Sequence, residues 1–379
     1  MHHSLVISKF RVALRPLTPV AIFSGVDGLV GYDVVIRDRD VCVVDYNALP
    51  ADVIMKLGEV KDPREYVNVL WNYRATLPCK FTSINNVGRL PPQTRVKLPQ
   101  ERLVPGSSLK GYVRTAILYY LLSSMALSSE TLRRLVDLSA EEPKYLATPL
   151  ERYVFKHMRL RAQGGEVDIL QNLHISDPLV VESVKLSLDW LNVFERGALT
   201  TGSPRPIAQV PGIVISDGTF RYDVSVIKAE PEFVAQGAIL ETLKSALKKL
   251  AEIAGLDLVG ALRRFGCDLL DYELDIVREL SVLRKYRELL ESFRSKYCGG
   301  AGAVCVIARL GFMTGHMAKT VDLYLKRFHP EIYEDVKKYM SSKVRRVWDE
   351  ATIKLVGPPL NPEKLLGLGW CELCIEKSK

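Results

Sequence analysis

Alternating apolar and polar residues open the chain. Mostly apolar residues occupy every second position from Val6 to Leu14, which predicts a strand that ends at Pro16-Leu17-Thr18-Pro19. Residues Val34–Ile36 and Val41–Val44 predict a hairpin across a short polar turn. The first part of the chain is therefore expected to be rich in strands.

A helical period follows in the stretch Leu103–Arg114 and beyond it. Apolar residues three and four positions apart form one stripe: Leu109, Tyr112, Val113, Ala116, Ile117, Tyr120 and Leu121. Ser107 or Ser108 suits the N-cap, and Lys110 and Arg114 lie four residues apart on the opposite face. Free N–H groups, the positive end of the helix dipole and two cations predict a helix terminus that binds phosphate. The residues of this first anion site are Gly106, Ser107, Ser108, Lys110, Gly111 and Arg114.

The rest of the pattern mixes helices and strands. Helices are predicted over residues 47–57, 63–73, 130–138, 239–253, 268–297 and 331–348. Strands are predicted over residues 207–214 and 219–228, paired across Ser216-Asp217-Gly218, and over 304–309, 352–356 and 368–375. Residues 80–97 are rich in Pro and Gly and predict a basic loop, and residues 197–206 predict a polar hairpin tip.

A second candidate anion site follows the strand predicted over residues 304–309. Gly311 and Gly315 allow close backbone approach, and nearby side chains can donate hydrogen bonds to phosphate oxygens. The donors of this second site are Arg309, Thr314, His316 and Lys319. A helix with an incidental glycine-rich entry is the alternative interpretation.

Composition and charge narrow the class of protein. The chain has 379 residues, of which 47% are hydrophobic and 25% charged, so a sizeable core is expected and extensive disorder is not. It contains no apolar run long enough for a transmembrane helix and no signal-peptide pattern, so we expect a cytoplasmic protein without a membrane partner. The net charge of +8 favours a polyanionic partner, and six basic residues crowd one window: Arg89, Arg95, Lys97, Arg102, Lys110 and Arg114.

The seven cysteines have no regular spacing that predicts a metal site. An odd number of scattered cysteines suits a reducing compartment. Cys371 and Cys374 have the spacing of metal ligands, but on a strand they point to opposite faces, and no second pair stands at zinc-finger distance. We therefore expect buried thiols and neither a metal nor a cofactor.

Other interpretations of the stretch Leu103–Arg114 are weaker. Gly111 is followed by Tyr112 and Val113 rather than by Lys and Ser or Thr, so it is not a Walker A loop. The Ser107-x-x-Lys110 spacing occurs in penicillin-recognising acylases, but the two further motifs of those enzymes are missing. An ordinary capped surface helix is the plain alternative.

Several motifs resemble those of one known family. Residues 106–111, Gly-Ser-Ser-Leu-Lys-Gly, followed by Arg114, resemble the signature of the RAMP superfamily, the RNA-binding subunits of type III CRISPR effector complexes. Further matching pieces follow in order along nearly the whole chain: Leu17-x-Pro19-Val20, Ser24-Gly25, His174-Ile175-Ser176-Asp177, Arg309-Leu310-Gly311, Thr314-Gly315, Lys319-Thr320 and Gly367-Leu368-Gly369-Trp370. The chain departs from the family at Ala21-Ile22-Phe23, which weakens any role for that N-terminal loop.

The resemblance implies an α+β fold of two ferredoxin-like (RRM-like) βαββαβ domains with helical insertions. We place these domains at residues 1–196 and 197–379, with the helical insertion of the second domain before residue 300. The usual aromatic motif of RRM domains is absent, so backbone contacts at loops and helix termini are expected to hold the RNA. Gly367 and Gly369 correspond to a glycine-rich RNA-contacting loop of the family.

Among the members, the chain most resembles the type III-A (Csm) subunit that caps the complex at the 3′ end of the CRISPR RNA (crRNA). This resemblance implies a non-catalytic subunit that binds crRNA near the target RNA, packs on a backbone RAMP subunit and other effector subunits, and supports crRNA maturation by host nucleases. The alternative is a backbone-type subunit with metal-dependent endoribonuclease activity on target RNA, for which Asp33 or Asp27 is the candidate catalytic residue. A turn Asp is the simpler interpretation of Asp33, and a protein-bridging scaffold that does not bind RNA is a third possibility.

Overall fold

One large mixed sheet organises the fold. The computed structural model describes residues 5–125, 127–136, 138, 146–155, 158–160, 165–167, 170, 173–200, 204–228, 258–299, 304–343 and 351–377. Within these residues thirteen strands form one sheet, whose main path runs β12-β15-β1-β11-β10-β5-β4-β3. The strands of the path are β1 (Leu5–Pro16), β3 (Val34–Ile36), β4 (Asp40–Val44), β5 (Cys79–Asn85), β10 (Val180–Glu195), β11 (Ala208–Lys228), β12 (Cys305–Arg309) and β15 (Trp370–Lys377).

Shorter strands join this path at its sides. They are β2 (Asp27–Leu29), β6 (Arg95–Lys97), β9 (Leu173–Ile175), β13 (Thr352–Val356) and β14 (Leu366–Gly367). Of these, β6 and β9 pair with β11, whereas β13 pairs with β10. A separate two-stranded sheet consists of β7 (Met158–Leu160) and β8 (Gly165–Val167).

The four central strands form a unit of the β-α-β-β-α-β type. The spatial order β15-β1-β11-β10 is antiparallel throughout, with Leu14 of β1 opposite Phe220 on one side and Leu373 on the other. Helix α3 (Gly106–Met125) lies between β1 and β10 in the chain, and α8 (Leu258–Arg278) and α9 (Arg284–Cys298) lie between β11 and β15. This is the order of a ferredoxin-like unit.

The unit draws its strands from both predicted domains. β1 and β10 belong to residues 1–196, whereas β11 and β15 belong to residues 197–379. The predicted boundary at residue 196 separates β10 from β11, two strands that pair from Val180–Arg221 to Val193–Ala208. One hydrophobic core also joins the two halves, from Val12 to Leu373. The fold is therefore α+β around a single sheet, and a division into two ferredoxin-like domains is not confirmed.

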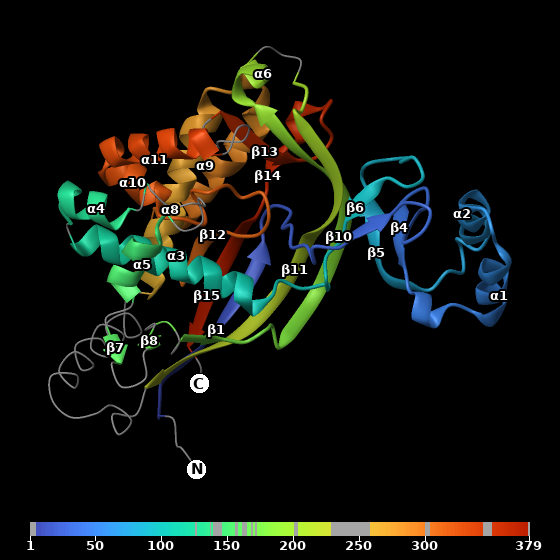
Figure 1. The fold of residues 1–379 in the computed structure, drawn as a ribbon, viewed down its shortest axis with the longest axis horizontal. Coiled ribbons are helices and arrows are strands. Elements are labelled where there is room, and N and C mark those ends of the chain that lie inside the picture. Colours follow the sequence, from blue (N-terminus) through green and yellow to red (C-terminus); the bar gives the residue numbers. More distant parts are fainter. Residues whose placement is uncertain are drawn as a thin grey trace.

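Most helices cover one face of the central strands. Figure 1 shows α3, α8, α9, α10 (Asp322–Phe328) and α11 (Pro330–Lys343) on the same side of the molecule. On α3 most of the apolar stripe predicted from the sequence is buried, including Leu109, Tyr112 and Ala116, whereas Tyr120 and Leu121 are partly exposed. Short helices complete this side: α4 (Ser129–Leu135), α5 (Thr148–Phe155) and α6 (Arg196–Thr200). Among the described helices, none combines the length and the apolar run that crossing a membrane requires.

Residues 27–97 form an outer lobe at the other end of the molecule (Figure 1). It contains β2 to β6 and the helices α1 (Ala51–Glu59) and α2 (Pro63–Asn72). Val53 of α1 and Leu70 of α2 pack on Val35 and Val44 in a small core of their own. Its link to the central sheet is the parallel pairing of β5 with β10 and of β6 with β11.

The structure confirms the first strand, the 34–44 hairpin and the central helix, and it corrects three other expectations. Residues 208–228 form one continuous strand rather than two strands joined by a turn. Gly218, at φ +144°, lies at an irregularity in the β10–β11 register, and the chain runs on in the same direction past it. The predicted basic loop 80–97 contains β5 and β6. The helix predicted over residues 268–297 is two helices, α8 and α9, and the helix predicted over 239–253 lies outside the described residues.

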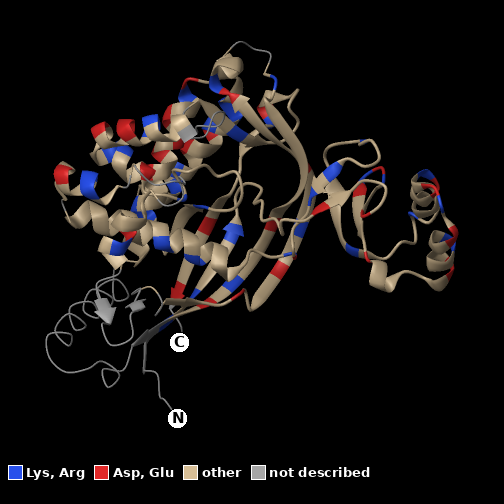
Figure 2. Ribbon diagram, in the orientation of Figure 1, with Lys and Arg blue, Asp and Glu red and all other residues tan. Residues whose placement is uncertain are grey.

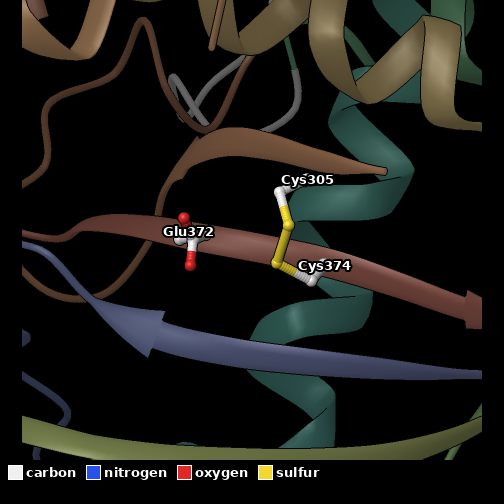
Figure 3. Close-up of side chains that lie close together, drawn as sticks. All are labelled: Cys305, Glu372 and Cys374. Atoms are coloured by element: carbon white, nitrogen blue, oxygen red, sulfur yellow. A yellow bond between two sulfur atoms is a disulfide. The ribbon is translucent and has the colours of Figure 1, made fainter. Parts of the chain in front are cut away.

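Six of the seven cysteines are paired in disulfides, which corrects the expectation of free buried thiols. The pairs are Cys42–Cys79, Cys267–Cys298 and Cys305–Cys374, and Cys371 is free and buried. Figure 3 shows the Cys305–Cys374 bond between β12 and β15, with Glu372 on the same strand as Cys374. Both sulfur atoms of this group are consumed by the bond, so the three side chains do not form a metal site while it is intact. The inference of a reducing compartment from the cysteine count therefore loses its basis.

Candidate nucleic-acid interface

The start of α3 is held by two segments that are distant from it in the sequence. The Tyr222 hydroxyl on β11 donates a hydrogen bond of 2.7 Å to the Val104 carbonyl just before the helix. The Gly106 N–H donates to the Asp177 carboxylate at 2.8 Å. A Cβ atom at Gly106 would lie 2.0 Å from the Ser176 carbonyl oxygen, so only glycine fits there. The Gly-Ser-Ser-Leu-Lys-Gly and His-Ile-Ser-Asp motifs thus meet at one point of the fold.

This arrangement changes the predicted chemistry of the helix terminus. The helix begins at Gly106, so Ser107 and Ser108 lie within its first turn and neither is the N-cap. The N–H of Gly106, the first helical residue, is one of the free donors of the first turn, and the distant Asp177 carboxylate accepts its hydrogen bond. The hydrogen-bond donors that remain for a phosphate are therefore the hydroxyls of Ser107 and Ser108 and the Ser107 N–H, rather than all the N–H groups of the first turn.

The two predicted cations of α3 differ in their surroundings. The Arg114 guanidinium donates to Glu151 at 2.9 Å and lies 4.4 Å from the centroid of the Phe155 ring. Its charge is therefore already balanced within the protein, contrary to the expectation of a cation available for phosphate. Lys110 is half-buried, and the described part of the chain offers it no ion-pair partner.

The second predicted anion site is a loop in an unusual backbone conformation. Gly311, Met313 and Gly315 have φ angles of +103°, +60° and +85°. A left-handed methionine costs free energy that the surrounding contacts must offset, and such residues cluster at functional sites. The Phe312 N–H donates to the Ala21 carbonyl at 2.6 Å, and a Cβ atom at Gly311 would lie 2.7 Å from the same oxygen. The backbone thus fixes the loop and leaves the Phe312 side chain 46% exposed.

Arg309 positions the loops and does not present a cation to solvent. Its side chain is 5% exposed, and its Nη1 lies 2.8 Å from Glu273 Oε2 on α8. Its Nε donates to the Leu368 carbonyl at 3.1 Å, and the guanidinium lies 5.0 Å from the Trp370 ring centroid. The expected phosphate contact of Arg309 is therefore replaced by a buried network.

Gly367 and Gly369 are also part of the interior, contrary to the expectation of an RNA-contacting loop. Both are buried. A Cβ atom at Gly367 would lie 1.9 Å from the Tyr286 hydroxyl, and one at Gly369 would lie 2.1 Å from the Leu310 carbonyl oxygen. These glycines are required by close packing against α9 and against the 309–319 segment.

The remaining donors of the loop divide into buried and exposed groups. Thr314 is 2% exposed, and its hydroxyl donates to the Gly311 carbonyl at 3.0 Å. The Nε2 atom of His316 lies 3.4 Å from an Asp322 carboxylate oxygen. Lys319 is exposed. Of the predicted side chains of this loop, Lys319 is thus the one presented to solvent.

The two predicted anion sites line one cavity. It has a volume of about 420 Å³ and lies between the first turns of α3 and the 309–319 segment. The polar and small residues facing it include Ser107, Ser108, Gly111, Thr115 and Lys319. Ala21, Ile22 and Phe23 complete the wall, so the N-terminal loop that departs from the family pattern belongs to the site. No carboxylate lines this cavity among the described residues, which suits a negatively charged ligand.

Asp27 and Asp33, the candidate catalytic residues, are both engaged within the outer lobe. The Asp27 carboxylate pairs with Lys97 at 2.8 Å, across the β2–β6 ladder. The Asp33 carboxylate accepts a hydrogen bond of 2.9 Å from the Leu29 N–H, as a turn aspartate does. Neither residue lines the cavity between α3 and the 309–319 segment.

The basic window is only partly available to a polyanion. Lys97 and Arg114 are in ion pairs, and Arg102 donates to the Val184 carbonyl. Arg89 and Arg95 are exposed on the outer lobe. Figure 2 shows acidic and basic residues interspersed along the helices and the central strands, so the excess positive charge does not form one continuous face in this view.

Comparison with known proteins gives no match among family models or curated proteins. Solved structures do match. One is a chain of the cryo-EM structure of a Csm–crRNA–target RNA ternary complex of a type III-A CRISPR-Cas system, with a TM-score of 0.60, 18% identity and coverage of 97% of this chain and 100% of that chain. The protein has the fold of a Csm subunit. A second match is the crystal structure of T. onnurineus Csm5, with a TM-score of 0.55, 17% identity and coverage of 95% and 99%.

Sequence reasoning missed two features of the site. Phe312 stands beside Phe23, with ring centroids 5.4 Å apart, and both line the cavity. The signal for Phe312 was an aromatic residue placed directly after Gly311 in a loop with a second glycine. Asp177 was noted only as part of the His-Ile-Ser-Asp motif, and its contact with the Gly106 N–H had no sequence signal, because the two segments lie about 70 residues apart.

Proposed function

We propose that this chain is a non-catalytic crRNA-binding RAMP subunit of a type III-A effector complex. The observation that carries the proposal is that the two segments chosen from the sequence for phosphate binding line one cavity, in which the described residues place no carboxylate. The shared fold with a subunit from a Csm–crRNA–target RNA complex supports it. On this proposal the protein acts in the cytoplasm, in antiviral defence, and the β15-β1-β11-β10 unit is one of two ferredoxin-like units.

Within that complex the chain caps the backbone filament at the 3′ end of the crRNA and supports crRNA maturation. The resemblance of its motifs and its structural likeness to a Csm5 protein support this position. Its partners are the crRNA, a backbone RAMP subunit, other effector subunits and host maturation nucleases. The engagement of Asp27 with Lys97 and of Asp33 with a turn N–H supports a subunit that does not cut RNA.

RNA binding by the cavity is tested with the full chain and single-stranded RNA. The variant Lys110→Ala with Lys319→Ala removes one cation on α3 and one in the cavity wall. Because each phosphate contact on a single strand contributes about 0.7 to the slope of log affinity against log salt, the slope should fall by up to about 1.4. The matched control is Lys61→Ala with Lys338→Ala, which removes two exposed lysines outside the cavity. An unchanged slope in the first variant, or an equal loss in the control, contradicts the proposal.

The position in the complex is tested by purifying the native complex through this chain and mapping its RNA. Short RNAs crosslinked to the subunit near their 3′ ends support the capping role. Crosslinks spread periodically along the guide contradict it and indicate a backbone subunit instead. Complete absence of RNA contradicts RNA binding altogether.

A further inference from the structure

A second cavity adjoins the first one on the other side of the 309–319 segment. It has a volume of about 520 Å³, and its floor consists of Leu191, Val193 and Val210 from the paired strands β10 and β11. Phe312 and Lys319 line both cavities. A hydrophobic groove thus adjoins the first cavity, and the exposed Phe312 side chain lines both.

Two lysines, Lys319 and Lys354, line this groove and favour an anionic ligand. His316, Lys319 and Lys354 line it, and no carboxylate does so among the described residues. Two other cavities each have a carboxylate in their lining: Asp38 in one of the outer lobe, and Glu273 in one beside residues 313–317. An apolar floor with a basic rim suits a ligand that joins a flat apolar group to a negative charge.

The backbone holds Phe312 in place before any ligand arrives. Its N–H is bonded to the Ala21 carbonyl, it is flanked by the left-handed residues Gly311 and Met313, and its ring meets Phe23 edge to face at 5.4 Å. Despite these contacts the side chain remains 46% exposed. An exposed aromatic ring on a fixed loop is a stacking platform that needs little ordering on binding.

From this geometry we infer that Phe312 is a base-stacking platform for single-stranded RNA. The backbone phosphate lies in the first cavity beside Ser107, Ser108 and Lys319, and the attached base stacks on Phe312 over the apolar groove. The inference rests on the proposed RNA-binding function and adds a residue that contacts the base rather than the phosphate. Because every base has a flat π face, the site takes RNA of any sequence.

The test is a binding series with the full chain and single-stranded RNAs. Phe312→Ala should weaken binding about 5- to 150-fold, the range that removal of one stacked base usually gives, while Phe312→Trp keeps or improves it. Trp71→Ala is the matched control, because Trp71 is a 47% exposed aromatic residue on the outer lobe and lies outside both cavities. The expected result is no change in this control.

A modified RNA separates stacking from a general loss of structure. An abasic site is moved along the RNA one nucleotide at a time, and at one position it should weaken binding to the wild-type protein but not to Phe312→Ala. A 2-aminopurine at that position should be quenched by Phe312→Trp, because a stacked indole donates an electron to the excited base, and not by Phe312→Ala.

The outcomes distinguish this inference from the proposed function. If the wild-type chain binds no RNA, the proposed function fails and the inference fails with it. If it binds RNA and Phe312→Ala binds equally well at every abasic position, only the inference is overturned. If Phe312→Ala keeps its RNA affinity but no longer assembles with other subunits, the groove is a protein-docking surface and the stacking role is likewise overturned.

Discussion

The buried ion pair between Arg309 and Glu273 gives the strongest prediction about stability. Both side chains are 5% exposed and their charged atoms lie 2.8 Å apart. Glu273 also accepts from the Tyr286 hydroxyl at 3.0 Å, and that hydroxyl accepts from Trp370 Nε1 at 3.0 Å. The pair therefore joins α8, α9, β12 and the 367–370 segment.

Replacement of one partner leaves the other charge buried without compensation. We expect Arg309→Met and Glu273→Leu each to lower the free energy of unfolding by about 3–5 kcal/mol. The Arg309 variant also leaves the Leu368 carbonyl without its Nε donor, which places it toward the upper end of that range. The double variant should lose less than the sum of the two single variants, because no isolated charge remains in it.

The assay is urea unfolding followed by far-UV circular dichroism and tryptophan fluorescence, whose coincidence tests two-state behaviour. Trp370 is buried 5.0 Å from the Arg309 guanidinium and reports on this region. The control is Lys285→Met with Glu363→Leu, an ion pair of 2.9 Å whose side chains are 55% and 61% exposed, for which little or no loss is expected because solvent screens the charges. Losses below about 1 kcal/mol in the Arg309 and Glu273 single variants would refute the reasoning from burial.

Two further predictions follow from the cysteines and from Glu372. The chain denatured without reductant should show one reactive thiol, from Cys371, and seven after reduction. Reduction should lower the thermal midpoint, because each disulfide closes a long loop and contributes about 2–4 kcal/mol. Seven reactive thiols before reduction would contradict the pairing. Burial raises the pKa of Glu372, but hydrogen bonds from Tyr297 and Lys296 outweigh it and hold the pKa below its usual range. A carboxylate whose pKa is lowered by folding stabilises the protein above its unfolded pKa, so Glu372→Gln should cost stability at pH 7, and this difference should shrink as the pH falls from about 5 to about 3. Urea unfolding at several pH values checks this, and a difference that is constant with pH would rule the explanation out.

The sequence by itself determined the features that depend on local periodicity. The first strand, the 34–44 hairpin and α3 were predicted from their own residues, because the spacing of apolar side chains must match the face that packs on the sheet. The motif around Gly106 and the loop after Arg309 were singled out as two separate candidate sites, and the structure places both at one cavity.

Tertiary structure decided which of those residues are available to a ligand. Glu151 neutralises Arg114, Asp177 occupies the first N–H of α3, and Glu273 holds Arg309 in the interior. Each of these partners lies more than 30 residues away in the chain, and a pairing at such a separation leaves no periodic signal.

The same reason accounts for the remaining differences. The Ser216-Asp217-Gly218 segment has the composition of a turn, but β10 pairs with Asp217 itself and with β11 on both sides of this segment, which keeps it extended. The cysteine pairs, and the exposure of Phe312 between two cavities, likewise exist only once distant strands and loops have come together. The sequence specified the elements and the residue types of the site, whereas the packing of distant segments determined which charges are balanced inside the protein and which face a ligand.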